Sequence, residues 1–132
     1  MPREEQIKIS YISDLSVNHY LGRRRDGGYY VKPEVKNWKE ELGWLLNSLH
    51  LEEWHLPLEI KCSGYFKDER SSPDLSNLSK IILDTIEDTT GINDKNMRWH
   101  DGIRDVGHTK NPYLLITIKE GEIKGEENAN TL

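Results

Sequence analysis

The stretch PDLSNLSK, residues 73–80, carries polar side chains whose types and spacing could serve an acidic active site. It places Asp74, Asn77 and Lys80 on the opening turns of a predicted helix, where proline and polar side chains favour helix initiation. A second carboxylate two residues after Asp74 would strengthen this interpretation, but that position holds Ser76. The stretch is therefore either a helix start, where the helix dipole favours the Asp74 carboxylate, or half of an active site.

Asp94, in the segment GINDK, is the second candidate for acidic chemistry. It lies 20 residues after Asp74, in the short link between the second predicted helix and the next strand. If that helix packs back along a sheet, the link lies at its far end. The two carboxylates then meet only if the link and strand fold back, or if a second subunit brings them together. The structural alternative for Asp94 is turn chemistry in the pair Asn93-Asp94.

Other catalytic chemistries find little support in the sequence. No G-x-S-x-G nucleophile elbow and no G-x-x-x-x-G-K-[ST] phosphate loop is present. His50 and His55 are five residues apart across a predicted helix end, which is poor geometry for a metal site. Cys62, the single cysteine, lies in an alternating segment and is predicted to fill the core. One thiol cannot form a disulfide framework, which favours a reducing, cytoplasmic setting.

The charge distribution limits nucleic-acid binding to a local patch. A net charge of −5 argues against a general electrostatic DNA binder. Arg23, Arg24 and Arg25 nevertheless fall together in a predicted long loop, residues 13–27, and loops of this length in compact domains are often functional. The arginines either bind DNA phosphates with a salt-sensitive affinity or belong to an ordinary solvated loop.

Hydrophobic periodicity predicts an alternation of strands and two main helices. The predicted strands are residues 6–12, 29–31, 56–66, 96–107 and 112–120, and the predicted helices run from Pro33 to about Leu49 and from Asp74 to Asp88. We expect the last two strands to form a hairpin-like pair around HTKNP. The fold class is α/β (α+β), with a small mixed sheet covered on one face by two main helices.

Length and composition favour one small soluble domain. The 132 residues are 35% hydrophobic and 31% charged, so the core should be small and dimerisation would help it. We expect one domain over residues 1–119 and an acidic, disordered tail over residues 120–132. No apolar run approaches the ~20 residues of a membrane span, and MPREEQIK lacks the apolar stretch of a signal peptide. The expected location is the cytoplasm, with no membrane partner.

Three segments carry a family resemblance: LSVNHYLGRRR, SSPDLSNLSKIILDTIEDTTGINDK and the closing strand YLLITI. Together with the order of elements, they resemble the RusA-like Holliday-junction resolvases (crossover junction endodeoxyribonucleases), which are common in prophages. The resemblance spans about residues 6–119. Its specific part is an Asp-x-Asp-Asn-x-x-Lys helix start followed about twenty residues later by an acidic link.

The resemblance implies a RusA-like homodimer that cuts four-way DNA junctions in recombination and repair in a Mg²⁺-dependent reaction, with Mn²⁺ as a possible substitute. It implies that Asp74 and Asp94 are catalytic metal ligands, with Ser76 at a third ligand position, and that Lys80 lies near the scissile phosphate. The DNA contacts that it implies are Asn18, Tyr20, Arg23, Arg24, Arg25 and Asn77.

This chain departs from the family pattern at two positions. Ser76 replaces the second aspartate of the helix start, and Asn93 replaces one acidic residue of the link. Three interpretations remain: a nuclease with a weaker or single metal site, a nuclease that recruits Asp68 or Glu69, and a catalytically impaired protein that binds junction DNA. A protein-interaction domain without a nucleic-acid role is a further alternative, which the acidic net charge favours.

Overall fold

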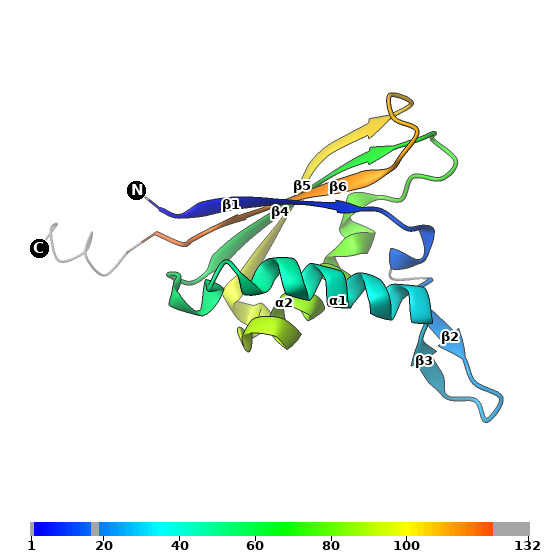
Figure 1. Ribbon diagram of the computed structural model, residues 1–132, viewed down its shortest axis with the longest axis horizontal. Coiled ribbons are helices and arrows are strands. Elements are labelled where there is room, and N and C mark those ends of the chain that lie inside the picture. The colour runs from blue at the N-terminus through cyan, green and yellow to red at the C-terminus, as the bar shows by residue number, and fades with distance from the viewer. Residues whose placement is uncertain (1, 17–18, 123–132) are drawn as a thin grey trace, which may run out of the picture.

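The computed structural model describes residues 2–16 and 19–122 (Figure 1). The strands are β1 (Glu4–Ser10), β2 (Leu21–Arg23), β3 (Tyr29–Val31), β4 (Leu58–Phe66), β5 (Met97–Val106) and β6 (Tyr113–Lys119), and the helices are α1 (Pro33–Asn47) and α2 (Ser79–Thr90). Short 3-10 turns at Leu75–Leu78 and Asp94–Asn96 precede α2 and β5. The predicted class, a mixed α+β fold with two main helices, is confirmed.

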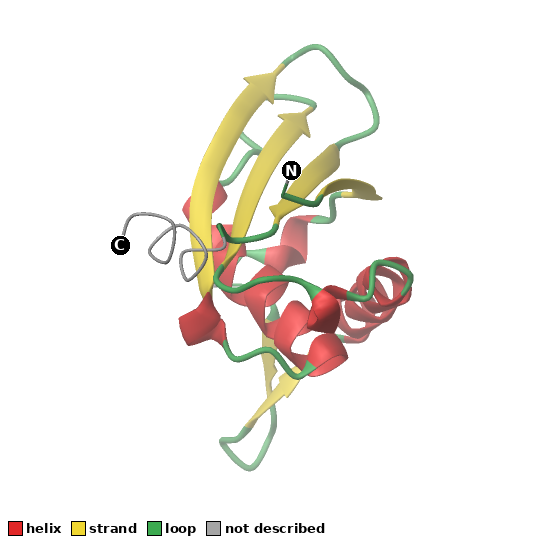
Figure 2. Ribbon diagram, turned by 90° about the vertical axis from the view of Figure 1, so that its left-hand side faces the viewer, coloured by secondary structure: helices red, strands yellow, loops and turns green. Residues whose placement is uncertain are grey.

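The large sheet has the strand order β1-β6-β4-β5. β4 and β5 are parallel and are connected through α2, whereas β6 runs antiparallel to both β1 and β4. Both helices lie on the same face of the sheet (Figure 2). The crossover through α2 brings the start of β5 back to the end of the sheet where β4 begins, and this determines where Asp94 lies.

The predicted hairpin of the last two strands is wrong. β5 and β6 are not neighbours, because β4 lies between them. The reason is burial: β6 is the more apolar strand, and its Leu114, Ile116 and Ile118 are fully buried when it pairs on both sides. The more polar β5 takes the edge, where most of its residues keep contact with water.

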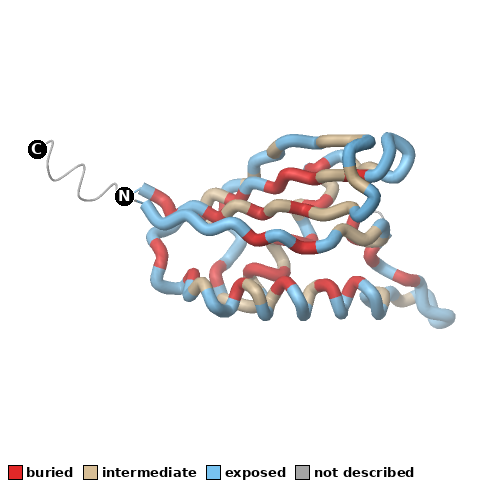
Figure 3. The backbone as a smooth tube through the Cα atoms, turned by 45° about the horizontal axis from the view of Figure 1, so that its top comes forward, coloured by how far each residue is buried: buried red, intermediate tan, exposed pale blue. Residues whose placement is uncertain are grey.

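The core lies between the sheet and the helices, as the alternating and helical patterns predict (Figure 3). Ile7, Leu58, Ile60, Cys62 and Ile116 are among its strand residues. From α1 it receives Val35, Trp38, Leu42 and Leu46. The Trp38 Nε1–H donates a 2.7 Å hydrogen bond to the carbonyl oxygen of Ser10, which fixes α1 against the end of β1. Neither helix in the described ranges has the length and apolar character needed to cross a bilayer.

The predicted long loop, residues 13–27, contains structure that the sequence pattern did not reveal. A 3-10 turn spans Ser13–Leu15, and β2 pairs with β3 in a separate antiparallel hairpin. Three-residue strands are too short to show a reliable alternation, which explains the missed element. Arg23 therefore belongs to a strand, while Arg24 and Arg25 lie in the turn that follows it.

The ordered domain extends past the predicted limit at residue 119. Glu120 is 6% exposed, and its carboxylate accepts hydrogen bonds from the backbone N–H of Arg3 and of His55. The backbone N–H of Gly121 in turn donates to the carbonyl oxygen of His55. The first two residues assigned to the tail are thus part of the fold, and residues 123–132 lie outside the described residues.

Candidate active site

Asp74 precedes the 3-10 turn Leu75–Leu78 in an extended conformation, with φ −68° and ψ 135°. It occupies the N-cap position, yet its side chain makes no capping hydrogen bond. The carboxylate is exposed. The backbone beside it is held by Arg104 of β5, whose Nε–H donates a 3.1 Å hydrogen bond to the carbonyl oxygen of Pro73. The helix-cap interpretation thus lacks its defining bond, and the carboxylate is available to a ligand.

Lys80 lies in the first turn of α2, where its Nζ donates a 3.1 Å hydrogen bond to Oδ2 of Asp84. This bond, together with the negative charge of Asp84, raises the pKa of Lys80. Asp94 and the ionised form of Tyr20 contribute in the same direction, because nearby negative charge also favours the ammonium form. Lys80 is therefore a protonated, half-exposed cation that Tyr20 and Asp94 approach from two different segments.

Asp94 begins the 3-10 turn that leads into β5. α2 ends at Thr90 and is capped by Gly91, whose φ of 80° is the left-handed conformation that glycine tolerates, and the link then turns back towards the helix. The backbone N–H of Asp94 donates a 3.0 Å hydrogen bond to Oε1 of Glu87. Lys80, Asp84 and Glu87 are spaced i, i+4 and i+7, so they share one face of α2. The link thus folds back onto the C-terminal part of α2, on the face whose first turn carries Lys80.

Asn77 and Tyr20 are the two described candidate DNA contacts near the start of α2. Asn77 lines a hollow of about 440 Å³ together with His19, Asp14 and the segment Arg70–Pro73. Tyr20 is 9% exposed, and its carbonyl oxygen accepts a 3.1 Å hydrogen bond from the backbone N–H of Lys32. Asn18 lies outside the described residues.

A family model described as endodeoxyribonuclease RusA matches residues 15–119. The match covers 105 of the 132 residues and includes the β2–β3 hairpin, α2 and Asp94. The chain belongs to the RusA endodeoxyribonuclease family. No curated protein matches it significantly. The family resemblance of the sequence motifs is therefore confirmed, and the residues of the RusA motif can be compared with their positions in space.

The side chains of the RusA motif do not all converge. Lys80 and Asp94 lie on the same side of α2, whereas no hydrogen bond or ion pair within the described residues connects Asp74 to either. Ser76 is exposed, and its carbonyl oxygen accepts a 2.8 Å hydrogen bond from the Ser79 hydroxyl. Asp74 thus lies before the start of α2, whereas Asp94 lies beyond its end, next to Glu87.

The donor chemistry of the RusA motif suits a hard cation such as Mg²⁺, which prefers oxygen ligands. Asp74 and Asp94 are exposed carboxylates, and Ser76 offers a neutral hydroxyl. Within residues 2–16 and 19–122, no group of three or more His, Cys, Asp and Glu side chains is placed to hold a metal ion. Mg²⁺ is often bound through one or two carboxylates, several waters and a substrate phosphate, so the residue types fit such a site.

Asp68 and Glu69, the two acids considered as alternative metal ligands in this RusA-family chain, form local hydrogen bonds and an ion pair instead. Asp68 Oδ1 accepts hydrogen bonds from the backbone N–H and the hydroxyl of Ser71, which lower the pKa of the Asp68 carboxyl. Glu69 Oε1 pairs with Arg104 at 2.9 Å. Both carboxylates thus support the turn between β4 and α2 and already have partners.

Sequence reasoning gave no role to Asp84 and Glu87, the two acids that contact Lys80 and the Asp94 backbone. The signal that could have found them is their spacing from Lys80, since i, i+4 and i+7 positions align along a helix. Helical spacing puts Asp84 on the polar face of this helix, but such a face is usually only solvated. The hydrogen bond of Glu87 to the following link depends on the turn at Gly91, which the polar face does not encode.

Proposed function

We propose that this chain is a divalent-metal-dependent endodeoxyribonuclease that cuts four-way (Holliday) DNA junctions in recombination and repair. Membership of an endodeoxyribonuclease family supports a nuclease in general. The observation that carries the finer proposal is that the backbone N–H of Asp94 donates to Oε1 of Glu87, on the face of α2 that also carries Lys80. A cation and a carboxylate on one side of a helix suit a site that binds a phosphodiester and a metal ion together.

Each residue of the motif has a proposed role. Asp74 and Asp94 would hold Mg²⁺ or Mn²⁺, and the Ser76 hydroxyl would contribute a neutral oxygen ligand or position a water. When bound, the ion activates water and stabilises negative charge on the scissile phosphate. Lys80 binds a phosphate oxygen and offsets the charge that develops there. Its raised pKa keeps it protonated at neutral pH, so this role needs no proton transfer.

Asn77, Tyr20 and the three arginines are the proposed DNA contacts. Asn77 lines a hollow beside the helix start, and His19, the residue before Tyr20, lines the same hollow. Arg23, Arg24 and Arg25 bind backbone phosphates further away, on the β2–β3 hairpin. Phosphate contacts of this kind fix the position of the protein on DNA without specifying sequence.

The proposed working unit is a homodimer in the cytoplasm. Paired incisions at symmetric positions of a junction need two equivalent sites, which a two-fold dimer provides. A second subunit could also bring one chain's Asp74 close to the other chain's Asp94. The single described cysteine, Cys62, is fully buried, and burial raises its pKa to about 12. Such a thiol is inert and suits a protein of a reducing compartment.

A catalytically impaired junction-binding protein is the second candidate. Ser76 supports it, because a hydroxyl supplies no negative charge where the RusA motif has a carboxylate. A protein of this kind would keep the phosphate contacts and the affinity for branched DNA, and it would lack cutting.

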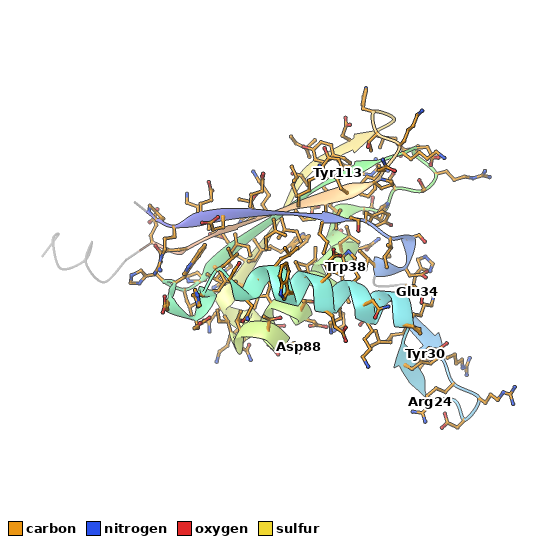
Figure 4. The ribbon with its side chains drawn as sticks, viewed as in Figure 1. Arg24, Tyr30, Glu34, Trp38, Asp88 and Tyr113 are labelled. Atoms are coloured by element: carbon orange, nitrogen blue, oxygen red, sulfur yellow. The ribbon has the colours of Figure 1, made fainter. Side chains whose placement is uncertain are left out.

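Gel-resolved cleavage of a synthetic four-way junction with Mg²⁺ or Mn²⁺ tests both candidates. The natural chain is compared with Ser76→Asp, Asp74→Asn and Asp88→Asn. Asp88 is the matched control, because it is an exposed carboxylate of α2 that pairs with Lys39 at 3.0 Å (Figure 4).

Paired, symmetric cuts by the natural chain and by Asp88→Asn, but not by Asp74→Asn, are the expected result for a resolvase. Cutting by Ser76→Asp alone would identify the natural chain as the impaired binder. If no variant cuts or binds the junction, both candidates are wrong, and a protein-interaction role becomes the remaining one.

A further inference from the structure

The β2–β3 hairpin projects from the body of the protein beside the start of α1 (Figures 1 and 4). Its root is fixed in three ways. The backbone N–H of Lys32 donates to the carbonyl oxygen of Tyr20, Lys32 Nζ pairs with Asp14 at 3.3 Å, and α1 begins at Pro33 directly after β3. His19, the residue before Tyr20, lines the same hollow as Asn77 and Pro73, so the root of the hairpin lies beside the start of α2 and Asp74.

The two faces of the hairpin differ. Tyr30 is opposite Gly22, and its ring covers this glycine so closely that a Cβ atom at residue 22 would collide with it. Tyr30 is thereby used to support the hairpin itself. The other face carries the cross-strand pairs Leu21–Val31 and Arg23–Tyr29, because directly opposite residues point to the same side.

Tyr29 is the most exposed aromatic side chain of this arm, at 64%. Within the described residues its ring stacks on no other ring, and its hydroxyl forms no hydrogen bond. Four of the seven large hydrophobic residues that are exposed in the described part of the chain belong to the hairpin, namely Leu21, Tyr29, Tyr30 and Val31. A protruding arm with this much exposed apolar surface is typical of a binding element.

The net charge of the β2–β3 hairpin indicates that it binds an anionic partner. Residues 21–31 carry three arginines and one aspartate, a net charge of +2 in a chain whose total is −5. Asp26 pairs with Arg24 at 3.5 Å, whereas Arg23 and Arg25 form no ion pair with any described residue. In a two-fold contact between two copies of this face, the same arginines would repel each other. Exposed aromatic rings together with arginines are the combination that binds nucleic acid by stacking and by phosphate contact.

An exposed ring such as that of Tyr29 has stacking partners at a DNA branch point and none along a continuous duplex. In a continuous duplex every base is stacked on its neighbours, so a tyrosine ring finds no free base face. At the branch point of an open junction the four arms end, and the faces of their last base pairs are uncovered. A ring at this point gains stacking that duplex DNA cannot offer.

We propose that the Tyr29 ring stacks on a base-pair face exposed at the branch point, while Arg23 and Arg25 bind the flanking phosphates. The hairpin thereby supplies the preference for branched DNA, and the site beside its root lies next to the strand to be cut. This inference rests on the proposed function, because it takes the junction as substrate.

Equilibrium binding in EDTA, where no cutting occurs, tests the role of Tyr29. A four-way junction and a duplex with the same arm sequence are titrated with the natural chain, Tyr29→Ala, Tyr29→Phe and Trp44→Ala. Trp44, on α1 and 76% exposed, is the matched control for the loss of an exposed aromatic ring. We expect Tyr29→Ala to weaken junction binding about tenfold and to leave duplex binding unchanged. Tyr29→Phe and Trp44→Ala should bind both DNAs as the natural chain does.

A second substrate checks that the ring contacts a base. Junctions with abasic nucleotides at the branch point should bind the natural chain about tenfold more weakly, and Tyr29→Ala should bind them no more weakly than the intact junction. The double variant Arg23→Ala/Arg25→Ala should reduce the slope of log affinity against log salt by about 2 for junction and duplex alike.

The outcomes separate the inference from the proposed function. If the natural chain prefers the junction and Tyr29→Ala keeps this preference, the inference is overturned and the proposed function is untouched. Equal weakening of both DNAs by Tyr29→Ala also overturns it, because the ring then makes a contact that does not depend on branching. Junction binding without cutting, lost selectively in Tyr29→Ala, supports the inference and rejects the nuclease. A natural chain that binds no junction overturns both.

Discussion

Two carboxylates at opposite ends of the fold differ in how many hydrogen bonds they accept. Glu120, after β6, accepts hydrogen bonds from the backbone N–H of Arg3 and of His55 and pairs with the Arg3 guanidinium at 3.1 Å. Asp74, before α2, is exposed and makes no capping hydrogen bond. Hydrogen bonds to the ionised form lower the pKa of Glu120 to about 2. The Glu120 carboxylate, whose oxygens have hydrogen-bond partners, stabilises the strand ends. The Asp74 carboxylate lacks a capping bond and remains accessible to a ligand.

The sharpest test of this difference is to neutralise each carboxylate in turn. Asp74→Asn should lower junction cleavage by about 10²-fold or more, because it removes a charged oxygen ligand, and it should leave the Tm unchanged. Glu120→Gln should lower the Tm by several degrees, because one amide cannot accept all of these hydrogen bonds. Its cleavage rate at a temperature where it is folded should match that of the natural chain.

Thermal unfolding by circular dichroism and timed junction cleavage measure the two effects. Asp88→Asn is the control for both, since Asp88 is an exposed carboxylate with a single surface partner. A Tm that falls in Asp74→Asn as much as in Glu120→Gln would show that Asp74 also has a structural role.

Much of this difference could not be predicted from the sequence. The pattern PDLSNLSK identified the helix start and its polar residues, because capping preferences and helical spacing are local properties. The same logic assigned Asp74 as a possible cap, and only the backbone shows that the capping bond is absent. Glu120 was assigned to a disordered tail, because its partners Arg3 and His55 are 117 and 65 residues away in sequence.

The order of the strands in the sheet also depends on contacts between residues far apart in sequence. The alternation of the β4 segment correctly predicted that Cys62 fills the core, since the period of a strand is local. Which strands become neighbours depends on where α2 returns the chain, so the expected β5–β6 hairpin was wrong. The hydrogen bond between the Asp94 backbone and Glu87 depends on the same crossover, and sequence spacing left the position of Asp94 open.

Acidification should distinguish the two carboxylates in a second, smaller way. Because the pKa of Glu120 is lower in the folded state than its ordinary value of 4.5, its contribution to stability is fully present above about pH 4.5 and is lost as the pH falls through about 2. The Tm of the natural chain should therefore fall over this range more steeply than that of Glu120→Gln. Equal slopes for the two proteins, measured by thermal unfolding at pH 2.5 to 6, would remove Glu120 from the account of acid stability.

The smallest expected effect concerns the hydrogen bond between Asp84 and Lys80. Asp84→Asn removes the main cause of the raised Lys80 pKa, so the pKa should move back towards its ordinary value of 10.5. The ammonium form is then lost at a lower pH. We expect cleavage at pH 7.5 to change by less than about threefold, because Lys80 is protonated there in both proteins. The alkaline decline of cleavage should begin at a lower pH in Asp84→Asn.

Asp88→Asn is again the matched control, because it also removes a carboxylate from α2 that pairs with a lysine, and its pH profile should equal that of the natural chain. A large loss of cleavage in Asp84→Asn at pH 7.5, with the alkaline limb unshifted, would contradict this expectation. Asp84 would then act on the metal ion or the substrate directly. Such a result would also name the carboxylate that takes over the charge missing at Ser76.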